Sequence, residues 1–179
     1  MRGTTNELAR IFLLLIAASS NALAAPPSKE AIYSCLLAYS VAPSVRVVEL
    51  PTKEINVEEG YRAGYDAKFF IRHAGKDIGY AEKGNSAAII YSGRLYTLTS
   101  AQPLLGTTEH PNEFDPYLSD WSQVRDRTGR YLCVSFPTGI LGQSGGFQKV
   151  RSGYLLAIDE KPARTLYFAI ANTDHYVKR

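Results

Sequence analysis

Residues 87–100, AAIIYSGRLYTLTS, contain the pattern that decides the fold. Two runs rich in branched and aromatic residues stand on either side of Ser92-Gly93, and residues of these kinds favour extended strands. A two-residue connection that contains glycine is typical of a β-hairpin, because the tight turn needs backbone with positive φ. The stretch therefore predicts two antiparallel strands joined by a tight turn.

Short runs of the same kind continue in both directions along the chain. They are SVRVVEL (44–50), YDAKFFIR (65–72), DIGYAEK (77–83), RYLCVSF (130–136), GYLLAID (153–159) and TLYFAIAN (165–172). Residues 55–64, INVEEGYRAG, are mostly polar and are expected to form a connection. Repeated short strands separated by turn residues indicate a mainly antiparallel sheet.

Residues 28–43, SKEAIYSCLLAYSVAP, show a helical pattern. Four residues of this segment fall at i, i+3, i+4 and i+7 and form one stripe: Ile32, Cys35, Leu36 and Tyr39. Ser28 is suited to cap the start of the helix, and Pro43 blocks its extension. We therefore predict an α+β fold in which one N-terminal helix packs on a mainly antiparallel sheet, as a small sandwich or a partly open barrel.

The first 24 residues have the order of a secretory signal peptide. Arg2 and Arg10 precede or flank a short apolar run at 11–18, and Ala22-Leu23-Ala24 provides small residues for cleavage. The run is much shorter than the ~20 residues of a membrane-spanning helix, so we expect no integral membrane segment after cleavage. Residues 25–179 are then a single exported domain, either periplasmic or secreted.

Charge and cysteine content limit the possible partners. The formal net charge is +3, and no basic stripe is present, so we expect no nucleic-acid partner. Cys35 and Cys133 form an even pair, which is interpreted as a disulfide in an oxidising compartment. A bridge that closes a loop of about 100 residues contributes about 4.7 kcal/mol in the chain-entropy model. The histidines show no ligand spacing with either cysteine, so neither a metal nor a cofactor is expected.

The string Gly142-Gln143-Ser144-Gly145-Gly146 makes Ser144 a candidate nucleophile. It resembles the active-serine loop of trypsin-like proteases, and residues 86–105 resemble the segment that carries the histidine of that family. Gln102 stands where the histidine is expected, and an amide cannot act as a general base. The order Ser144, Asp159, His175 also resembles that of α/β-hydrolases, but glycines interrupt the helix required after the serine. A glycine-rich loop is therefore favoured, with a small envelope serine hydrolase or an inactive trypsin-like relative as the alternative.

In residues 102–126 the apolar residues follow neither the spacing of a helix nor that of a strand, so this stretch is predicted to form a long loop. Tyr117 and Trp121 stand in this acidic, proline-marked stretch, and such aromatic residues are enriched at recognition surfaces. We predict that Tyr117 and Trp121 contact a partner, with Gln143 and Ser144 alongside. The favoured hypothesis is a non-enzymatic binding protein, inhibitor- or immunity-like, whose partner is a protein or another envelope component.

Overall fold

The computed structural model describes residues 25–108, 112–138, 149–159 and 164–176. The predicted signal peptide, and Gln143 and Ser144 with their glycines, lie outside these residues. The elements in chain order are α1 (Lys29–Leu37), β1 (Arg46–Glu49), β2 (Asn56–Arg62), β3 (Tyr65–His73), β4 (Lys76–Lys83), β5 (Ser86–Tyr91), β6 (Arg94–Thr97), η1 (Leu98–Ser100), β7 (Gln102–Pro103), β8 (Asp120–Asp126), β9 (Gly129–Pro137), β10 (Val150–Ala157) and β11 (Leu166–Asn172).

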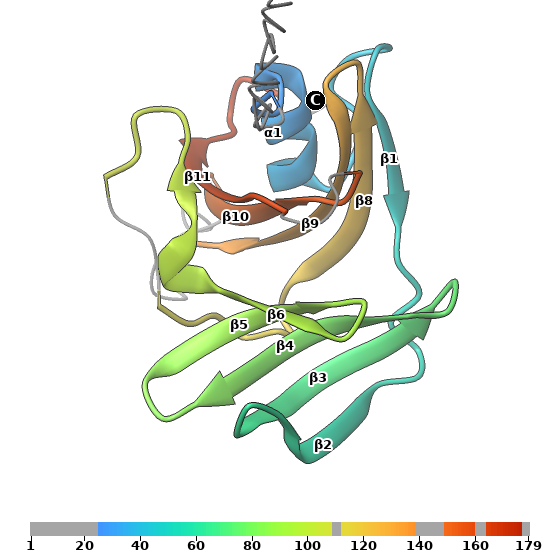
Figure 1. The fold of residues 1–179 in the computed structure, drawn as a ribbon. Helices are drawn as coiled ribbons and strands as arrows, with labels where there is room; N and C mark the ends of the chain where they lie inside the picture. Colours follow the sequence, from blue (N-terminus) through green and yellow to red (C-terminus); the bar gives the residue numbers. More distant parts are fainter. Residues whose placement is uncertain (1–24, 109–111, 139–148, 160–163, 177–179) are drawn as a thin grey trace, which may run out of the picture.

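The strands form two sheets, and both are mainly antiparallel. Sheet A has the order β1-β8-β9-β10-β11-β7, in which only the β11–β7 pair is parallel. Sheet B is the continuous meander β2-β3-β4-β5-β6. Figure 1 shows sheet B in the lower half of the view, sheet A above it, and α1 on the far side of sheet A. The expected combination of one helix with mainly antiparallel strands is therefore confirmed for the described residues.

The main core lies between the two sheets. Alternate residues of sheet A and sheet B face each other there, as the two-residue period of a strand requires. They include Trp121, Val134, Tyr154 and Phe168 from sheet A, and Phe69, Ile71, Tyr80, Ile89 and Tyr91 from sheet B. The predicted hairpin belongs to sheet B, and its turn residues Ser92 and Gly93 have φ values of 50° and 69°. This prediction is confirmed.

The helix packs on the other face of sheet A and is bonded to it covalently. Ser28 caps α1 by accepting a hydrogen bond from the Ala31 N–H at 3.1 Å. Cys35 is fully buried and forms the predicted disulfide with Cys133 of β9, with Cα atoms 5.7 Å apart. The helix is shorter than its sequence pattern predicted, because Ala38 adopts a left-handed conformation with φ 55° and ends it. No helix among the described residues is both long enough and apolar enough to cross a membrane.

Two predicted connections are wrong. Residues 56–62 form β2, which lies at the edge of sheet B and is exposed along nearly its whole length. An edge strand of this kind has no buried face, so its sequence lacks the apolar alternation that marks a strand. The predicted long loop at 102–126 contains β7 and all of β8, which pairs with β1 and β9.

Candidate functional site: an apolar edge between the sheets

Trp121 lies inside the protein rather than on its surface. Its side chain is 1% exposed, and its ring stacks on Phe69 with centroids 5.2 Å apart. The indole N–H donates to the Pro116 carbonyl at 3.0 Å. Both contacts hold residues 112–119 against sheet B, so Trp121 anchors the segment in which a contact site was predicted and its ring is not exposed to a partner.

Tyr117 and Leu118 are the exposed part of that segment. Their exposed fractions are 57% and 63%. The Tyr117 hydroxyl donates to the Lys68 carbonyl at 3.0 Å, and its ring meets Phe69 edge-on at 5.5 Å. Asp115 Oδ1 accepts hydrogen bonds from the backbone N–H groups of Tyr117 and Leu118 at 2.8 and 3.3 Å. Hydrogen bonds therefore hold the backbone of both residues in place, and the Tyr117 side chain is held as well.

Strand β2 and the residue before it carry two further exposed apolar side chains, Val57 and Ile55. Val57 stands between Asn56 and Glu58, which pair with Phe70 and Ala67, so it lies next to the part of β3 that binds Tyr117. Val57 is 61% exposed, and Ile55 is exposed as well. We call the surface formed by Ile55, Val57, Tyr117 and Leu118 the apolar edge.

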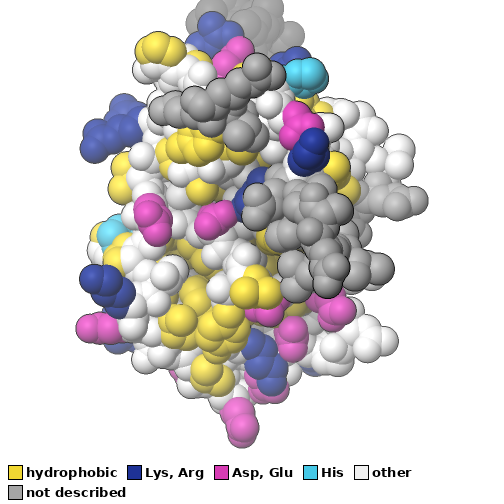
Figure 2. Space-filling model, turned by 180° about the vertical axis from the view of Figure 1, so that it is seen from behind, with side chains coloured by type: hydrophobic (Ala, Val, Ile, Leu, Met, Phe, Trp, Pro, Cys, Tyr) yellow, Lys and Arg dark blue, Asp and Glu magenta, His cyan; other side chains and the backbone are white. Residues whose placement is uncertain are grey.

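The apolar edge contains four of the six large hydrophobic side chains that are exposed in the described residues. Seen from behind, hydrophobic side chains gather in the lower half of the molecule, which is the half that sheet B occupies (Figure 2). The sequence analysis predicted Tyr117 as a contact residue but did not include Leu118 or Val57. The available signal was an isolated apolar residue within a polar stretch, and that signal is weak because single exposed hydrophobics are common.

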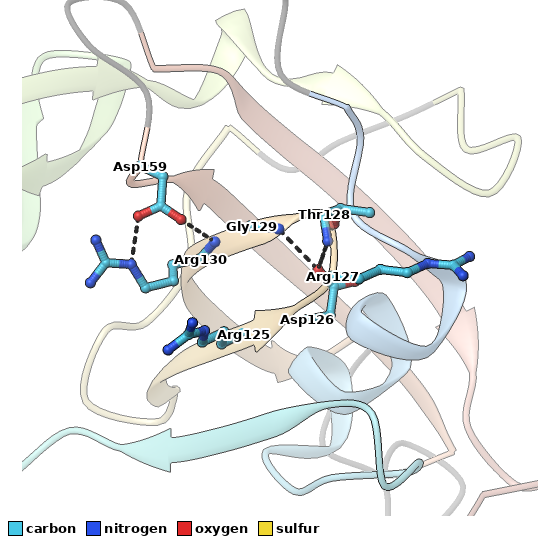
Figure 3. A pocket seen from close by; sticks show the side chains of 7 residues that line it. All are labelled: Arg125, Asp126, Arg127, Thr128, Gly129, Arg130 and Asp159. Atoms are coloured by element: carbon cyan, nitrogen blue, oxygen red, sulfur yellow. Dashed lines mark hydrogen bonds and ion pairs between the residues drawn. The ribbon is translucent and has the colours of Figure 1, made fainter.

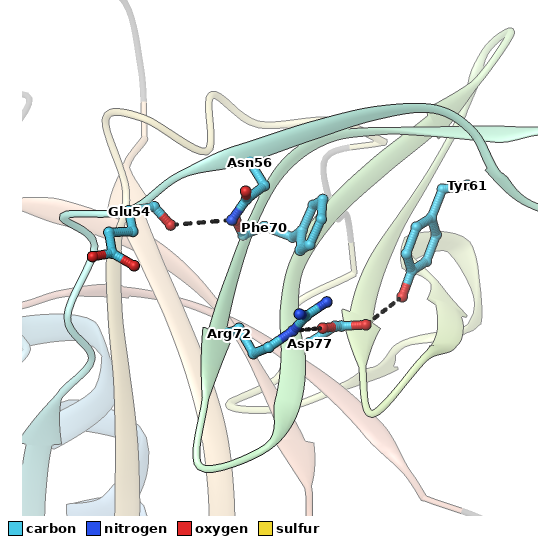
Figure 4. A network of polar contacts seen from close by, with 6 residues as sticks. All are labelled: Glu54, Asn56, Tyr61, Phe70, Arg72 and Asp77. Atoms are coloured by element: carbon cyan, nitrogen blue, oxygen red, sulfur yellow. Dashed lines mark hydrogen bonds and ion pairs between the residues drawn. The ribbon is translucent and has the colours of Figure 1, made fainter.

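A polar network fastens β2 to the rest of sheet B (Figure 4). Asp77 accepts hydrogen bonds from the Tyr61 hydroxyl at 3.4 Å and from Arg72 Nε at 3.1 Å. Tyr61 also packs on Phe70, with ring centroids 5.8 Å apart. Burial and the Asp77 carboxylate raise the pKa of Tyr61, so its hydroxyl keeps its proton to a higher pH than that of an exposed tyrosine. The network fixes the strand that presents Val57.

A second, polar recess surrounds the turn between β8 and β9. Its volume is about 560 Å³, and seven residues line it: Arg125, Asp126, Arg127, Thr128, Gly129, Arg130 and Asp159. Asp126 accepts from the N–H groups of Thr128 at 2.8 Å and Gly129 at 3.2 Å (Figure 3). Burial alone would raise the pKa of Asp126, but hydrogen bonds from Ser28 and Thr128 hold it below its ordinary value. The recess offers guanidinium donors, which suit binding of an anion.

Asp159 of the hydrolase-like pattern and Gln102 of the protease-like pattern lie within the described ranges. Asp159, the acid of the hydrolase-like order, accepts hydrogen bonds from the Arg130 side chain and backbone. Gln102 lies in β7 opposite Tyr167, and its side chain is exposed. Within the described ranges, no group of three His, Cys, Asp or Glu residues is placed to hold a metal ion. The described residues therefore offer two candidate sites, the apolar edge and the polar recess at the β8–β9 turn.

No protein-family model, curated protein or solved structure matches this chain.

Proposed function

We propose that the chain is an exported, non-enzymatic binding protein whose apolar edge docks on a protein of the periplasm or the extracellular space. The observation that carries this proposal is the exposed pair Tyr117-Leu118, held by Asp115 and by the Lys68 carbonyl. Exposed apolar patches mark interaction sites. A patch that is already ordered also loses little conformational entropy when it binds.

The disulfide and the leader sequence support an exported location. A bond between Cys35 and Cys133 uses both cysteines of the chain and is stable in an oxidising compartment. The leader pattern of residues 1–24 directs a chain to such a compartment. The protein would therefore act in an oxidising compartment and bind its partner through an ordered, exposed apolar surface.

The test is affinity capture by the full-length chain with a C-terminal tag, expressed in a host that exports it. Leu118→Asp places a charge at the most exposed residue of the apolar edge and should abolish capture of the partner. Tyr117→Ala should weaken the affinity for that partner by about thirtyfold, which corresponds to ~2 kcal/mol for a hot-spot residue.

The matched control is Leu105→Asp. Leu105 is also an exposed leucine, but it follows β7 at the opposite edge of sheet A from β1. This variant should capture the partner as the unmodified chain does. Equal capture by Leu118→Asp and by the unmodified chain would contradict the proposal. Covalent labelling by a fluorophosphonate probe that is lost in Ser144→Ala would favour the serine hydrolase instead.

A further inference from the structure

Three arginines stand side by side across sheet A. Arg46 of β1 pairs with Arg125 of β8, and Arg125 pairs with Arg130 of β9. Residues directly opposite each other on neighbouring strands project from the same face of a sheet, and the strands are about 4.8 Å apart. The three side chains therefore start from one line across the sheet, and we call them the arginine row.

The arginine row is electrostatically unfavourable without an added anion. Like charges placed directly opposite each other on adjacent strands destabilise a sheet. Arg130 is compensated by Asp159, which accepts from its Nε and from its backbone N–H. Within the described part of the chain, Arg46 and Arg125 form no ion pair, and all three arginines are exposed. Two adjacent guanidinium groups are thus available to an external carboxylate.

A recess between these side chains is sized for such a group. Its volume is about 190 Å³, and its lining includes Arg46, Val48, Gln123, Arg125 and Arg130. In Figure 3 the side chains of Arg125 and Arg130 extend to the same side as Asp159, whereas Arg127 extends to the opposite side. The bonds from Arg130 to Asp159 show that this surface already accommodates a carboxylate. Planar guanidinium forks match the geometry of carboxylates.

The arginine row projects from the face of sheet A that meets sheet B. Alternation along β1 puts Arg46, Val48 and Leu50 on one face, and alternation along β8 does the same for Arg125 and Trp121. The Leu50 N–H donates to the Trp121 carbonyl at 2.9 Å. The Trp121 ring stacks on Phe69, and the Phe69 ring also contacts Tyr117 edge-on. The arginine row is therefore linked to Tyr117 through buried residues of the core between the sheets.

We infer that the arginine row receives acidic side chains of the same protein partner that docks on the apolar edge. The identity of the partner as a protein rests on the proposed function, whereas the carboxylate site itself can be tested alone. Arg and Tyr are both enriched in protein interfaces, where they contribute a large part of the binding energy. The net charge of the whole chain is only +3, so the positive field is local, as suits a small acidic patch rather than an extended anionic surface.

The experiment uses a fluorescein-labelled octaglutamate peptide and the full-length chain, with binding measured by fluorescence anisotropy at about 20 mM and about 150 mM salt. Arg46→Gln/Arg125→Gln should weaken peptide binding at least about tenfold. The control Lys53→Gln/Arg62→Gln removes the same charge from exposed positions outside the arginine row and should bind as the unmodified chain does. Arg125→Gln alone should raise the Tm by about 1–4 °C, because it relieves repulsion within the row.

Four results would overturn the inference. They are equal weakening in the control double variant, absence of peptide binding at low salt, row-dependent binding to phosphatidylglycerol vesicles without peptide binding, and a lower Tm in Arg125→Gln. Leu118→Asp should leave octaglutamate binding unchanged. Failure of the apolar edge in the capture experiment is thereby distinguished from failure of the arginine row.

Discussion

Gly79 shows how closely two strands of sheet B approach each other. It lies in β4 opposite Phe70 of β3, next to a register shift between Ala67 and Phe69. A Cβ atom at Gly79 would lie 2.1 Å from the Phe69 carbonyl oxygen and 2.6 Å from the Phe70 Cα. Both are backbone atoms, so a side chain at this position requires the strands to separate.

We therefore expect Gly79→Ala to lower the free energy of unfolding by ~3 kcal/mol, measured by urea denaturation. Gly84→Ala is the control, because no atom lies within 4 Å of its Cβ position and its cost comes from a φ of +55°. That cost should be about 1 kcal/mol. If the two variants lose the same stability, the close approach at Gly79 is not what requires glycine there.

At the level of single residues, the sequence predicted partners only where the choice was small. A chain with two cysteines allows only one internal pairing, and Cys35–Cys133 is the bond observed. Trp121 was expected in a contact loop because prolines and acidic residues surround it. Its burial depends on Phe69, which comes from the other sheet. A contact of that separation leaves no local pattern in the sequence.

Most elements with a buried face were predicted from the spacing of their apolar residues, namely the helix and the strands β3, β4, β5, β9, β10 and β11. Strand β8 also has buried residues but was predicted as part of a loop, because prolines and acidic residues precede it. Strand β2 was missed because it is an edge strand whose residues are polar and exposed. The arginine row was missed for a different reason: it depends on the register of β1, β8 and β9, and no single strand reveals that register.

The disulfide joins α1 to a central strand of sheet A, so its loss should loosen the helix most. We expect Cys35→Ala/Cys133→Ala to lower the free energy of unfolding by about 2–5 kcal/mol in urea denaturation. Amide hydrogen exchange should increase more in α1 than in β4, because β4 packs in the other sheet. The unmodified chain under reducing conditions provides the matched comparison. Equal stability of the oxidised chain and the double variant would contradict the expectation.

At the scale of the whole molecule, we expect two buried tyrosines to lower the free energy of unfolding as the pH rises into the alkaline range. Tyr80 and Tyr154 lie in the core between the sheets, and burial, with smaller contributions from Glu82 at Tyr80 and from Tyr80 at Tyr154, raises the pKa of both. Both phenols keep their protons in the folded state at a pH where the unfolded chain releases them. Their contribution is therefore complete below about pH 10, the ordinary tyrosine value, and is lost as the pH rises above it.

Urea denaturation at about pH 8 and about pH 11 should show a lower free energy of unfolding at the higher pH. The loss should be smaller in Tyr154→Phe, which removes one of the two titrating groups while keeping most of its packing. Both cysteines of the chain are bonded to each other, so the alkaline samples contain no free thiol that could reshuffle the bond. A pH-independent free energy of unfolding across this range would refute the expectation.

The pairing of β1 with β8 makes sheet B an excursion: the chain leaves sheet A after β1 and returns to it only at β7 and β8. Within the excursion each hairpin joins neighbours in sequence, whereas β1–β8 pairing must bring distant segments together and pays a larger entropy of loop closure. During biosynthesis the meander of sheet B can thus fold before the C-terminal strands have been synthesised. Sheet A can then be completed only when β8 to β11 are available. The disulfide between α1 and β9 forms at that stage, after sheet B has folded.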